Sequence, residues 1–590
     1  MSKLNFVSKE LITKGWSSDK KYCVTDESGA RYLLRLSDIS QYNAKEIEFQ
    51  MMKKVAALGV PMCRPIAFGC CDENLIDEEC VGDEEHVHAE KYVYSLQEWI
   101  EGGEGGGDAE ELMPGFSDTE QYVYGLEAGR ILKKIHSIPA PSELEDWSIR
   151  FNRKLDNKIK KYGECPLKYQ GGEAFVDYIN ANRHLLKGRP QVYQHGDYHI
   201  GNMMIDQDGK LQIIDFNRSD FGDPWEEFNR IVWCAQASPL FASGMVNGYF
   251  DGQVPMEFWK LLALYIAGNT LSSIYWAIPF GEAEVNTMIN QAAEVLEWYD
   301  HMRNPVPKWY FEGYYLQEID GVPFKLKSPF DFSFLNKYGK VFQVFDDQDS
   351  GNICFGTEKD GERYFVKFAG APTERNSITP EVAVARIKET LAIYQDLQHP
   401  NLLELVAAED IGGGYALVFK WTDGVCMGRM YPAAHQRFMQ LPIAERLKVF
   451  EDILSFFEHM AAQNYVAIDF YDGSIMYDFA LRKTKICDID YFREMPTVND
   501  MGHMWGSSRF QAPEEYQLGA DLDEITNVYT LGATAFALFG EYYRTREKWQ
   551  LSEELFAVAK KAVSDNRSER QQSIREFSME WKEVLLCRFI

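Results

Sequence analysis

Two parts of the chain begin with the same order of hydrophobic patterns. In the first, residues 21–25 (KYCVT) and 31–36 (RYLLRL) are short runs of apolar and β-branched residues around a polar turn, which is typical of paired strands. Residues 44–58 then have helical spacing, and Gly59 and Pro61 stop the helix. The start of the chain is therefore predicted to form two strands followed by a helix.

The second part repeats this order. Residues 341–345 (VFQVF) and 364–368 (YFVKF) are predicted strands, and a helical run over 380–397 ends at the sequence HPN. A recurrence of this kind indicates two copies of one architecture. We expect the boundary between them in residues 304–330, which are rich in proline, glycine and aromatic residues.

The length of the chain supports this division. Its 590 residues and 68.0 kDa exceed one typical domain, for which about 150 residues is the usual prior. We predict a first domain over residues 1–305, a linker over 306–334 and a second domain over 335–590. Apolar residues make up 45% of the chain and charged residues 26%, a globular composition that excludes wholesale disorder.

The chain is strongly acidic, with a formal net charge of −29. Binding to nucleic acid or to an anionic membrane needs a basic surface, so neither is expected as a partner. The charge is compatible with a cationic ligand, although such an excess more often serves solubility.

The cysteines and the apolar segments indicate a cytoplasmic protein with reduced thiols. The eleven cysteines contain no C-x-x-C pair, so neither a disulfide scaffold nor a structural zinc site is expected. The N-terminus lacks the apolar core of a signal peptide. The most apolar window, residues 261–280, carries polar residues such as Asn269 and Thr270, which favours a buried helix over a membrane span.

The segment from residue 192 to 228 contains the strongest candidate chemistry. It holds a His-Gly-Asp sequence ending at Asp197, then Asn202, and then Asp215 at the end of an apolar run. If residues 203–205 and 211–214 pair as a hairpin, these three side chains surround one site. Asp215 would bind Mg²⁺, Asn202 would supply a neutral oxygen, and Asp197 would accept a proton from a hydroxyl. Phosphoryl transfer needs these groups.

This segment resembles the catalytic and metal-binding loops of the aminoglycoside phosphotransferase family, whose fold is protein-kinase-like. The likeness covers roughly residues 5–305 and includes GDPWEEF (residues 222–228), with Glu227 where the family usually has Asp. The resemblance implies ATP as the phosphoryl donor, with GTP as an alternative, and Mg²⁺ as the metal. His195 is interpreted as a structural residue. For His199, a hydrogen bond within the loop is favoured over a substrate contact.

The resemblance also implies nucleotide-binding residues nearer the N-terminus. GWSSDKKY is similar to the family's phosphate loop, in which the Ser17 and Ser18 hydroxyls would meet phosphates. Arg35 stands where a phosphate-binding Lys is expected. Glu48 would be its ion-pair partner on the following helix, with Glu46 as the alternative.

The second half resembles the protein kinase fold more loosely, over about residues 335–590. Asp469 matches the catalytic base, and Ser474 stands where the family has a metal-binding Asn. Asp488 is the preferred second metal ligand, with Asp490 as the alternative. Lys367 matches the phosphate-binding Lys, and the expected helical partner of Lys367 is Glu389.

The resemblance predicts one structural pair and reveals several departures. Glu514, in an Ala-Pro-Glu sequence, is expected to form a buried ion pair with Arg570. The turn over residues 346–351 carries three Asp residues where a glycine-rich cover for phosphates is expected, and three carboxylates there would repel ATP unless they face outward or bind metal. Three interpretations stay open for this domain: a degraded regulatory or scaffolding module, an active protein kinase, or a second small-molecule kinase.

Together these observations predict an α+β chain of two tandem protein-kinase-like bilobal domains. Each would have an N-terminal lobe of antiparallel sheet plus a helix and a mostly helical C-terminal lobe. The leading function is ATP-dependent phosphorylation of a hydroxyl on a small molecule by the first domain. A cationic, aminoglycoside-like acceptor is one candidate. The acidic helix over residues 282–300 could line its site, although a solvated helix face is the favoured interpretation of these acids.

Two other functions remain as alternatives. One is a serine/threonine protein kinase that acts on a protein acceptor through the second domain, and the other is a non-catalytic binding scaffold. The identity of the acceptor, the choice between ATP and GTP and the oligomeric state stay open.

Overall fold

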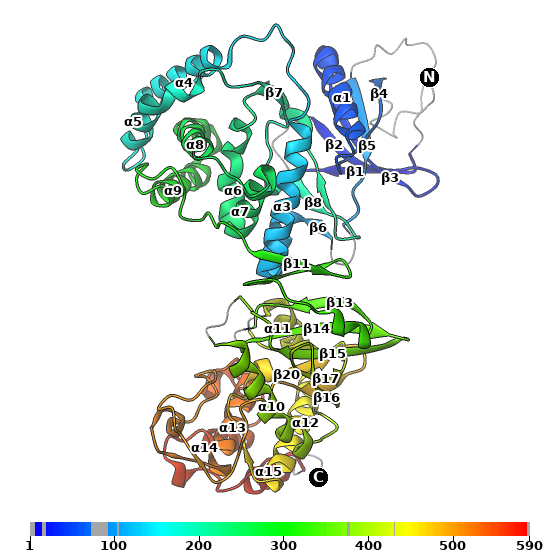
Figure 1. Cartoon of the computed structure of the whole chain (residues 1–590), viewed down its shortest axis with the longest axis vertical. Coiled ribbons are helices and arrows are strands. Elements are labelled where there is room, and N and C mark those ends of the chain that lie inside the picture. The colour runs from blue at the N-terminus through cyan, green and yellow to red at the C-terminus, as the bar shows by residue number, and fades with distance from the viewer. Residues whose placement is uncertain are drawn as a thin grey trace. The chain divides into compact units, whose positions relative to one another are not determined.

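The computed structural model describes residues 6–13, 19–71, 92–102, 106–348, 350–374, 378–429 and 431–586. The chain divides into two compact units, Met1–Gly313 and Tyr314–Ile590 (Figure 1). The described residues form 15 α-helices and several antiparallel sheets, so the predicted mixture of α and β structure is confirmed.

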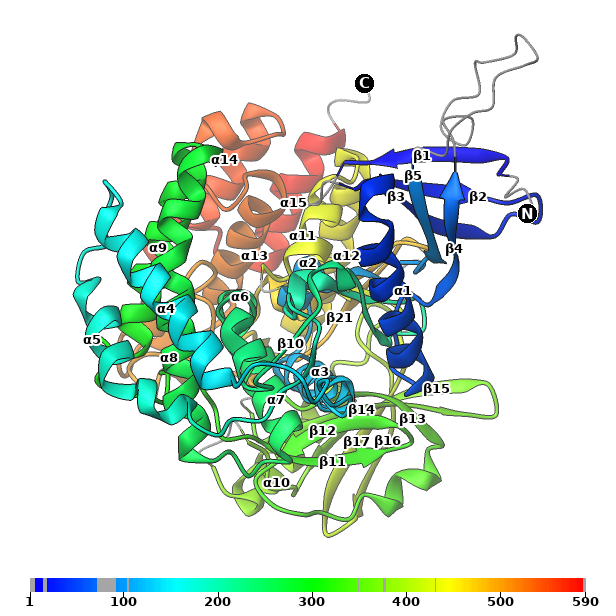
Figure 2. The ribbon, with the colours of Figure 1, turned by 90° about the horizontal axis from the view of Figure 1, so that it is seen from above.

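The first unit begins with a five-stranded antiparallel sheet. Its strands lie in the order β1-β2-β3-β5-β4, and their bounds are β1 Ser8–Ile12, β2 Lys20–Thr25, β3 Arg31–Asp38, β4 Pro65–Cys71 and β5 Tyr92–Glu98. Helix α1, Tyr42–Ala57, connects β3 to β4 and lies beside this sheet (Figure 2). Phe49, Met52 and Val55 form part of its buried face. Strands β2 and β3 and helix α1 confirm the predicted strand–strand–helix order, whereas β1, β4 and β5 were not predicted individually.

Helices α3 (Asp118–Ile135) and α7 (Pro239–Phe250) pack with unusually close backbones. A Cβ atom on Gly125 would lie 2.2 Å from the carbonyl oxygen of Phe241, and one on Gly248 would lie 2.1 Å from that of Leu126. No side chain fits at either position, so glycine is required for this helix pair.

Helix α8, Met256–Ala277, is the central helix of this part of the first unit. It packs against α4 (Trp147–Glu164), α5 (Glu173–Asn182) and α9 (Glu282–Trp298), which surround it in both views (Figures 1 and 2). Its length and composition alone would suit a membrane span, but 67% of its most apolar window is buried inside the protein. The predicted buried helix is therefore confirmed.

The second unit contains a sheet of the same strand order, β13-β14-β15-β17-β16. The bounds are β13 Lys340–Phe345, β14 Asn352–Lys359, β15 Glu362–Ala369, β16 Leu405–Ile411 and β17 Gly414–Lys420. Helix α10, Pro380–Asp396, occupies the place of α1 between the third and fourth strands in sequence. The rest of the unit is mainly helical, with α12 Ile443–Ala462, α13 Glu524–Phe539, α14 Glu553–Ala562 and α15 Ile574–Leu586.

The segment over residues 306–334 differs from the predicted linker because most of it is folded. Tyr310 donates a hydrogen bond to Asn247 at 2.7 Å within the first unit. Strands β11 (Tyr315–Ile319) and β12 (Val322–Leu326) form a hairpin in the second unit, where Phe324 and Leu326 enter a buried cluster. Aromatic residues that marked the predicted boundary, such as Tyr310 and Phe324, anchor this segment.

Candidate active site

A short hairpin and the loop before it hold the three central residues of the first unit. Strand β8 (Met203–Ile205) pairs with β9 (Leu211–Ile213), which confirms the predicted hairpin. Asp197 follows β7 (Val192–Gln194), Asn202 directly precedes β8, and Asp215 lies two residues after β9. The structure therefore brings the three predicted residues to one end of the hairpin.

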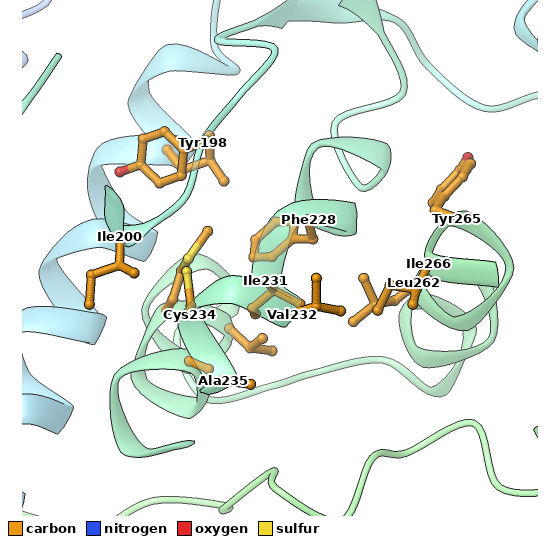
Figure 3. Close-up of a cluster of buried hydrophobic side chains, with 14 of the residues drawn as sticks. Tyr198, Ile200, Phe228, Ile231, Val232, Cys234, Ala235, Leu262, Tyr265 and Ile266 are labelled. Atoms are coloured by element: carbon orange, nitrogen blue, oxygen red, sulfur yellow. The ribbon is translucent and has the colours of Figure 1, made fainter. Parts of the chain in front are cut away.

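Buried side chains fix the loop between β7 and β8 in place. Tyr198 is fully buried, and its hydroxyl donates to the carbonyl oxygen of Ala128 at 2.7 Å. Figure 3 shows the cluster, in which Tyr198 and Ile200 of the loop lie near Phe228 and Cys234 and the cluster continues to α8. Because such packing restricts side-chain movement, the loop backbone is held in one arrangement.

The hydrogen bonds of Asn202 orient its amide group. Its side-chain Nδ2 donates to the backbone carbonyl oxygen of Asp197 at 2.8 Å, and its backbone carbonyl oxygen accepts from the Ile214 N–H at 3.0 Å. This assignment leaves the Oδ1 atom of Asn202 as the amide atom available to a metal. Asp215 adopts a left-handed backbone with φ of 64°, which is uncommon for a residue with a side chain and is found at functional sites.

Arg35 of β3 links the sheet to Asp215. Its Nη1 lies 2.7 Å from Asp215 Oδ1, and its Nη2 lies 3.0 Å from Asp19 Oδ2. Although burial alone would raise the pKa of the Asp215 carboxyl, the charge and hydrogen bond of Arg35 hold this pKa below its ordinary value. Asp215 is therefore ionised at neutral pH, as a metal ligand must be.

Asp19 is a residue of this site that sequence reasoning missed. Lys45 Nζ lies 2.8 Å from Asp19 Oδ2, and Ser37 donates to Asp19 Oδ1 at 2.7 Å. Burial would raise the pKa of Asp19, but Lys45, Ser37 and Arg35 together hold it below its ordinary value. Its only signal in the sequence was its position, as an acid directly before the strand over residues 20–25.

The predicted partner of Arg35, Glu48, reaches the same cluster through Lys45, whose Nζ lies 3.1 Å from Glu48 Oε2. Burial raises the pKa of Glu48 above its ordinary value. The alternative residue, Glu46, makes no hydrogen bond or ion pair with a described residue. Ser17 and Ser18 lie outside the described residues.

Two arginines that the sequence interpretation did not identify contact Asp197. Arg218 Nη1 lies 3.3 Å from Asp197 Oδ2, and Arg230 Nε lies 3.3 Å from Asp197 Oδ1. Arg218 belongs to the segment that was singled out, three residues after Asp215, and Arg230 lies two residues beyond the end of that segment at Phe228. Their basic charge was the available signal.

The two histidines of the loop behave as interpreted. His195 is fully buried, and its Nε2 lies 2.9 Å from the carbonyl oxygen of Ile214, so it braces the loop. His199 accepts a hydrogen bond from the Gly201 N–H at 3.2 Å. Burial lowers the pKa of His199 to about 4, so it is neutral at pH 7 and suits this hydrogen-bonding role.

The sequence GDPWEEF supports the loop rather than supplying reacting groups. Asp223 is fully buried and forms a two-point ion pair with Arg189, at 2.6 and 2.9 Å. Glu227 accepts a hydrogen bond from the Gly196 N–H at 2.8 Å, directly before Asp197. Both acids therefore position the backbone around the site.

The second unit repeats part of this geometry. The Cys487 N–H donates to the carbonyl oxygen of Ser474 at 2.9 Å, as Ile214 does to Asn202. Asp488 has a left-handed backbone with φ of 55°, like Asp215. The structure thus places Asp488, rather than Asp490, at the position equivalent to Asp215.

The loop around Asp469 differs from its counterpart in the first unit. The Ser474 hydroxyl lies 3.5 Å from the carbonyl oxygen of Asp469, a long contact compared with 2.8 Å for Asn202 and Asp197. Asp469 is itself left-handed, with φ of 61°, whereas in the first unit the left-handed residue is Gly196, before Asp197. The second loop therefore has a weaker hydrogen bond between its two site residues, and its strained backbone conformation falls on the predicted base, Asp469.

Lys367 is held by acids that follow β21 (Lys483–Ile486) instead of by helix α10. Its Nζ lies 3.3 Å from Asp488 Oδ1 and forms a second ion pair with Asp490. Tyr394 donates to Asp490 at 3.2 Å. Burial raises the pKa of Asp490, while Lys367 opposes that change.

The predicted pairing of Lys367 with Glu389 is wrong. Glu389 is exposed and makes no ion pair with a described residue. The buried face of α10 includes Ile387, Thr390 and Tyr394. One residue along a helix turns the side chain by about 100°, and Thr390 occupies the buried position next to Glu389.

The acidic turn after β13 is compensated from within the unit. The backbone N–H of Lys325 donates to Asp346 Oδ2 at 2.8 Å, and Lys325 Nζ forms an ion pair with Asp347. Lys325 is buried, with 1% exposure. The carboxylates of Asp346 and Asp347 are thus engaged by Lys325, which reduces their repulsion of an anionic ligand. The third acid, Asp349, lies outside the described residues.

The predicted ion pair between Glu514 and Arg570 is confirmed. Arg570 donates to Glu514 Oε1 at 2.7 Å and to Oε2 at 3.0 Å, and both side chains are buried. Arg567, which was not predicted, also lies 2.7 Å from Glu514 Oε1.

A comparison with protein families bears on the first unit. The model of the Phosphotransferase enzyme family matches residues 10–259, a range that includes Arg35, Asp197, Asn202 and Asp215. The resemblance of the N-terminal half to phosphotransferases is therefore confirmed. A search of curated proteins finds no match to the chain.

Proposed function

We propose that the N-terminal unit transfers a phosphoryl group from Mg-ATP, or alternatively Mg-GTP, to a hydroxyl of a small molecule. The observation that carries this proposal is the connected set of Asp197, Asn202 and Asp215, with Arg35 bonded to Asp215. The match to a phosphotransferase family supports the reaction class.

The donor atoms present fit magnesium. Asp215 offers an ionised carboxylate and Asn202 a neutral oxygen, the hard oxygen ligands that Mg²⁺ takes. Within the described ranges, no group of three or more His, Cys, Asp or Glu residues could hold a metal by itself. Mg²⁺ in kinase sites usually has one or two protein carboxylates, with phosphate oxygens and water completing its shell. When bound, the ion would neutralise charge on the phosphates.

The side chains have distinct roles in the proposed reaction. Arg35, fixed between Asp19 and Asp215, presents a buried cation to the donor phosphates. Asp197 accepts the proton of the acceptor hydroxyl and orients its oxygen. Since phosphoryl transfer depends mainly on positioning and charge stabilisation, the packed loop and the arginines at Asp197 support it directly.

We propose further that the chain consists of two tandem kinase-like domains in the cytoplasm, and that the second is regulatory or only weakly active. The shared strand order and the matching backbone bonds at Asn202 and Ser474 support the duplication. The ion pair of Lys367 with Asp490 and the long Ser474 contact weigh against efficient transfer.

A protein kinase activity of the second unit is the other candidate function. It is favoured by Lys367, Asp469 and Asp488, together with the Glu514–Arg570 pair. It would require a nucleotide to compete with Asp490 for Lys367. The first unit therefore remains the preferred site of catalysis.

Replacing Asp215 with asparagine tests the metal assignment. The change removes a charged magnesium ligand, so we expect Mg-ATP affinity to fall at least about tenfold. Isothermal titration calorimetry on the full chain measures this affinity, and circular dichroism checks the fold. The matched variant Asp488→Asn, in the second unit, should leave Mg-ATP binding by the first unit unchanged. Unchanged binding by Asp215→Asn would contradict the assignment.

A further inference from the structure

Two arginines lie beside Asp197, and Lys158 of α4 lies within electrostatic range of one of them, Arg230. Arg218 and Arg230 contact the Asp197 carboxylate, and Lys154 and Lys158 lie one turn apart on α4. Lys154 and Arg230 are the basic groups whose charges act on Lys158. We call these four residues the basic cluster. It gives a local positive charge to a chain whose net charge is −29.

Lys158 lacks a counter-ion. Its half-buried ammonium group makes no hydrogen bond or ion pair with a described residue. Burial, with Lys154 and Arg230 nearby, lowers the pKa of Lys158 to about 7, although Glu226 opposes this change. A cation placed among other cations is destabilising unless an anion joins them.

Arg230 has donors to spare. Its Nε faces Asp197, but its two terminal nitrogens make no hydrogen bond with any residue in the described ranges. Its side chain is only 27% exposed. An arginine fork that is partly buried and unused on one side suits a carboxylate or a phosphate, which it can bind with two parallel hydrogen bonds.

Glu226 does not neutralise the cluster. Its Oε1 lies 3.7 Å from Lys154 Nζ, and its Oε2 accepts a hydrogen bond from Gln194 at 3.2 Å. The Glu226 carboxylate is thus engaged by Lys154 and Gln194, and it forms no ion pair with Lys158 or Arg230.

We propose that Lys158 and Arg230 bind an anionic group, a carboxylate or a phosphate, on the acceptor molecule. The inference rests on the proposed phosphotransferase function and narrows its substrate class. Because Arg230 contacts Asp197 as well, an acceptor held through its anion would present its hydroxyl to the base. This differs from the cationic, aminoglycoside-like acceptor that the resemblance and the charge of the whole chain suggested.

The acidic helix that was considered as an acceptor surface gives less support. Glu294 of α9 accepts a hydrogen bond from Gln236 at 2.6 Å, so at least one carboxylate of this helix is already engaged within the protein. The side chains next to Asp197 are the positively charged Arg218 and Arg230, and an acceptor whose hydroxyl reaches Asp197 would lie beside them.

The test is a competition at Lys158 in the full chain. A limiting amount of acetic anhydride at pH 7 acetylates lysines, and peptide mass spectrometry quantifies Lys158 against exposed lysines of the same helix. The reaction is run with inorganic phosphate, acetate or choline chloride at equal ionic strength, each with and without saturating Mg-ADP. We expect phosphate or acetate to protect Lys158, and choline to give no protection.

Each outcome has a definite meaning. Protection by phosphate indicates a phosphorylated acceptor, and protection by acetate a carboxylate acceptor. Arg230→Gln should weaken protection about tenfold, the value of one charge-assisted hydrogen bond, whereas Arg153→Gln, on the exposed side of α4, should not change it.

The inference is overturned if neither anion protects Lys158, or if choline protects it. It is also overturned if a non-hydrolysable Mg-ATP analogue protects Lys158 without an added anion while Mg-ADP does not, because the cluster would then bind the donor's terminal phosphate. Failure of the phosphotransferase proposal would appear separately, as absence of Mg-nucleotide binding in calorimetry.

Discussion

Replacing Asp197 with alanine is expected to slow ATP-dependent phosphoryl transfer about 10²–10⁴-fold, the range for loss of a positioned general base. The carboxylate has no substitute within its loop, since His199 is held neutral by burial and is engaged with the Gly201 N–H. Mg-ATP binding should persist, because Arg35 and Asp215 are untouched. ADP release, measured with a coupled assay, reports the rate.

The matched control is Asp469→Ala in the second unit. We expect this change to alter ADP release less than about tenfold. The second site already lacks the short hydrogen bond that joins Asn202 to Asp197 in the first unit. Activity that survives Asp197→Ala and disappears with Asp469→Ala would assign catalysis to the second unit and favour a protein kinase.

Replacing Glu514 with glutamine is expected to destabilise the second unit by about 3–5 kcal/mol, the usual cost of breaking one side of a buried ion pair. The change leaves the Arg570 guanidinium, which is fully buried, without its carboxylate. Urea denaturation of the full chain, followed by tryptophan fluorescence, measures the free energy of unfolding.

A surface pair provides the comparison for Glu514. Lys582 lies 2.8 Å from Glu458, but both side chains are substantially exposed. Lys582→Gln should therefore cost no more than about 1 kcal/mol. Equal effects of the two substitutions would contradict the structural role assigned to Glu514.

The same ion pair predicts a dependence of stability on pH. Burial would raise the pKa of Glu514, but the hydrogen bond and charge of Arg570, with Arg567, hold it below its ordinary value. Its contribution is therefore present above the pKa of an unfolded glutamate and is lost as pH falls through the lowered value. The Glu514→Gln variant should lack this part of the acid destabilisation.

Local patterns were sufficient to predict the repeated elements of the fold. The strands around residues 21–36 and 341–368 are short apolar runs beside polar turns, and the strands of the hairpin next to Asn202 and Asp215 are short and apolar. The pairing of Glu514 with Arg570 followed from a resemblance that preserves both residues. These features depend on residues close in sequence or on well-marked motifs.

Other features depend on contacts between distant residues and could not be read from spacing. Asp19 joins Arg35 and Lys45 only after the sheet and α1 have folded. Glu389 was chosen by sequence interval, but a small error in helical phase moved the choice from the buried face to the exposed one. Lys158 became a candidate binding residue because it is partly buried without an ion-pair partner among the described residues, and burial cannot be read from composition.

The hairpin of β11 and β12 affects where this protein can be divided. It lies before the repeated strand–strand–helix pattern, yet Lys325 is the buried counter-ion of Asp347, and Phe324 and Leu326 are part of the core. A fragment that began at residue 335 would keep Asp346 and Asp347 but lose Lys325, which contacts both of them, together with strands β11 and β12. Truncations, fusions or domain exchanges should therefore cut near Tyr314, where the second unit begins.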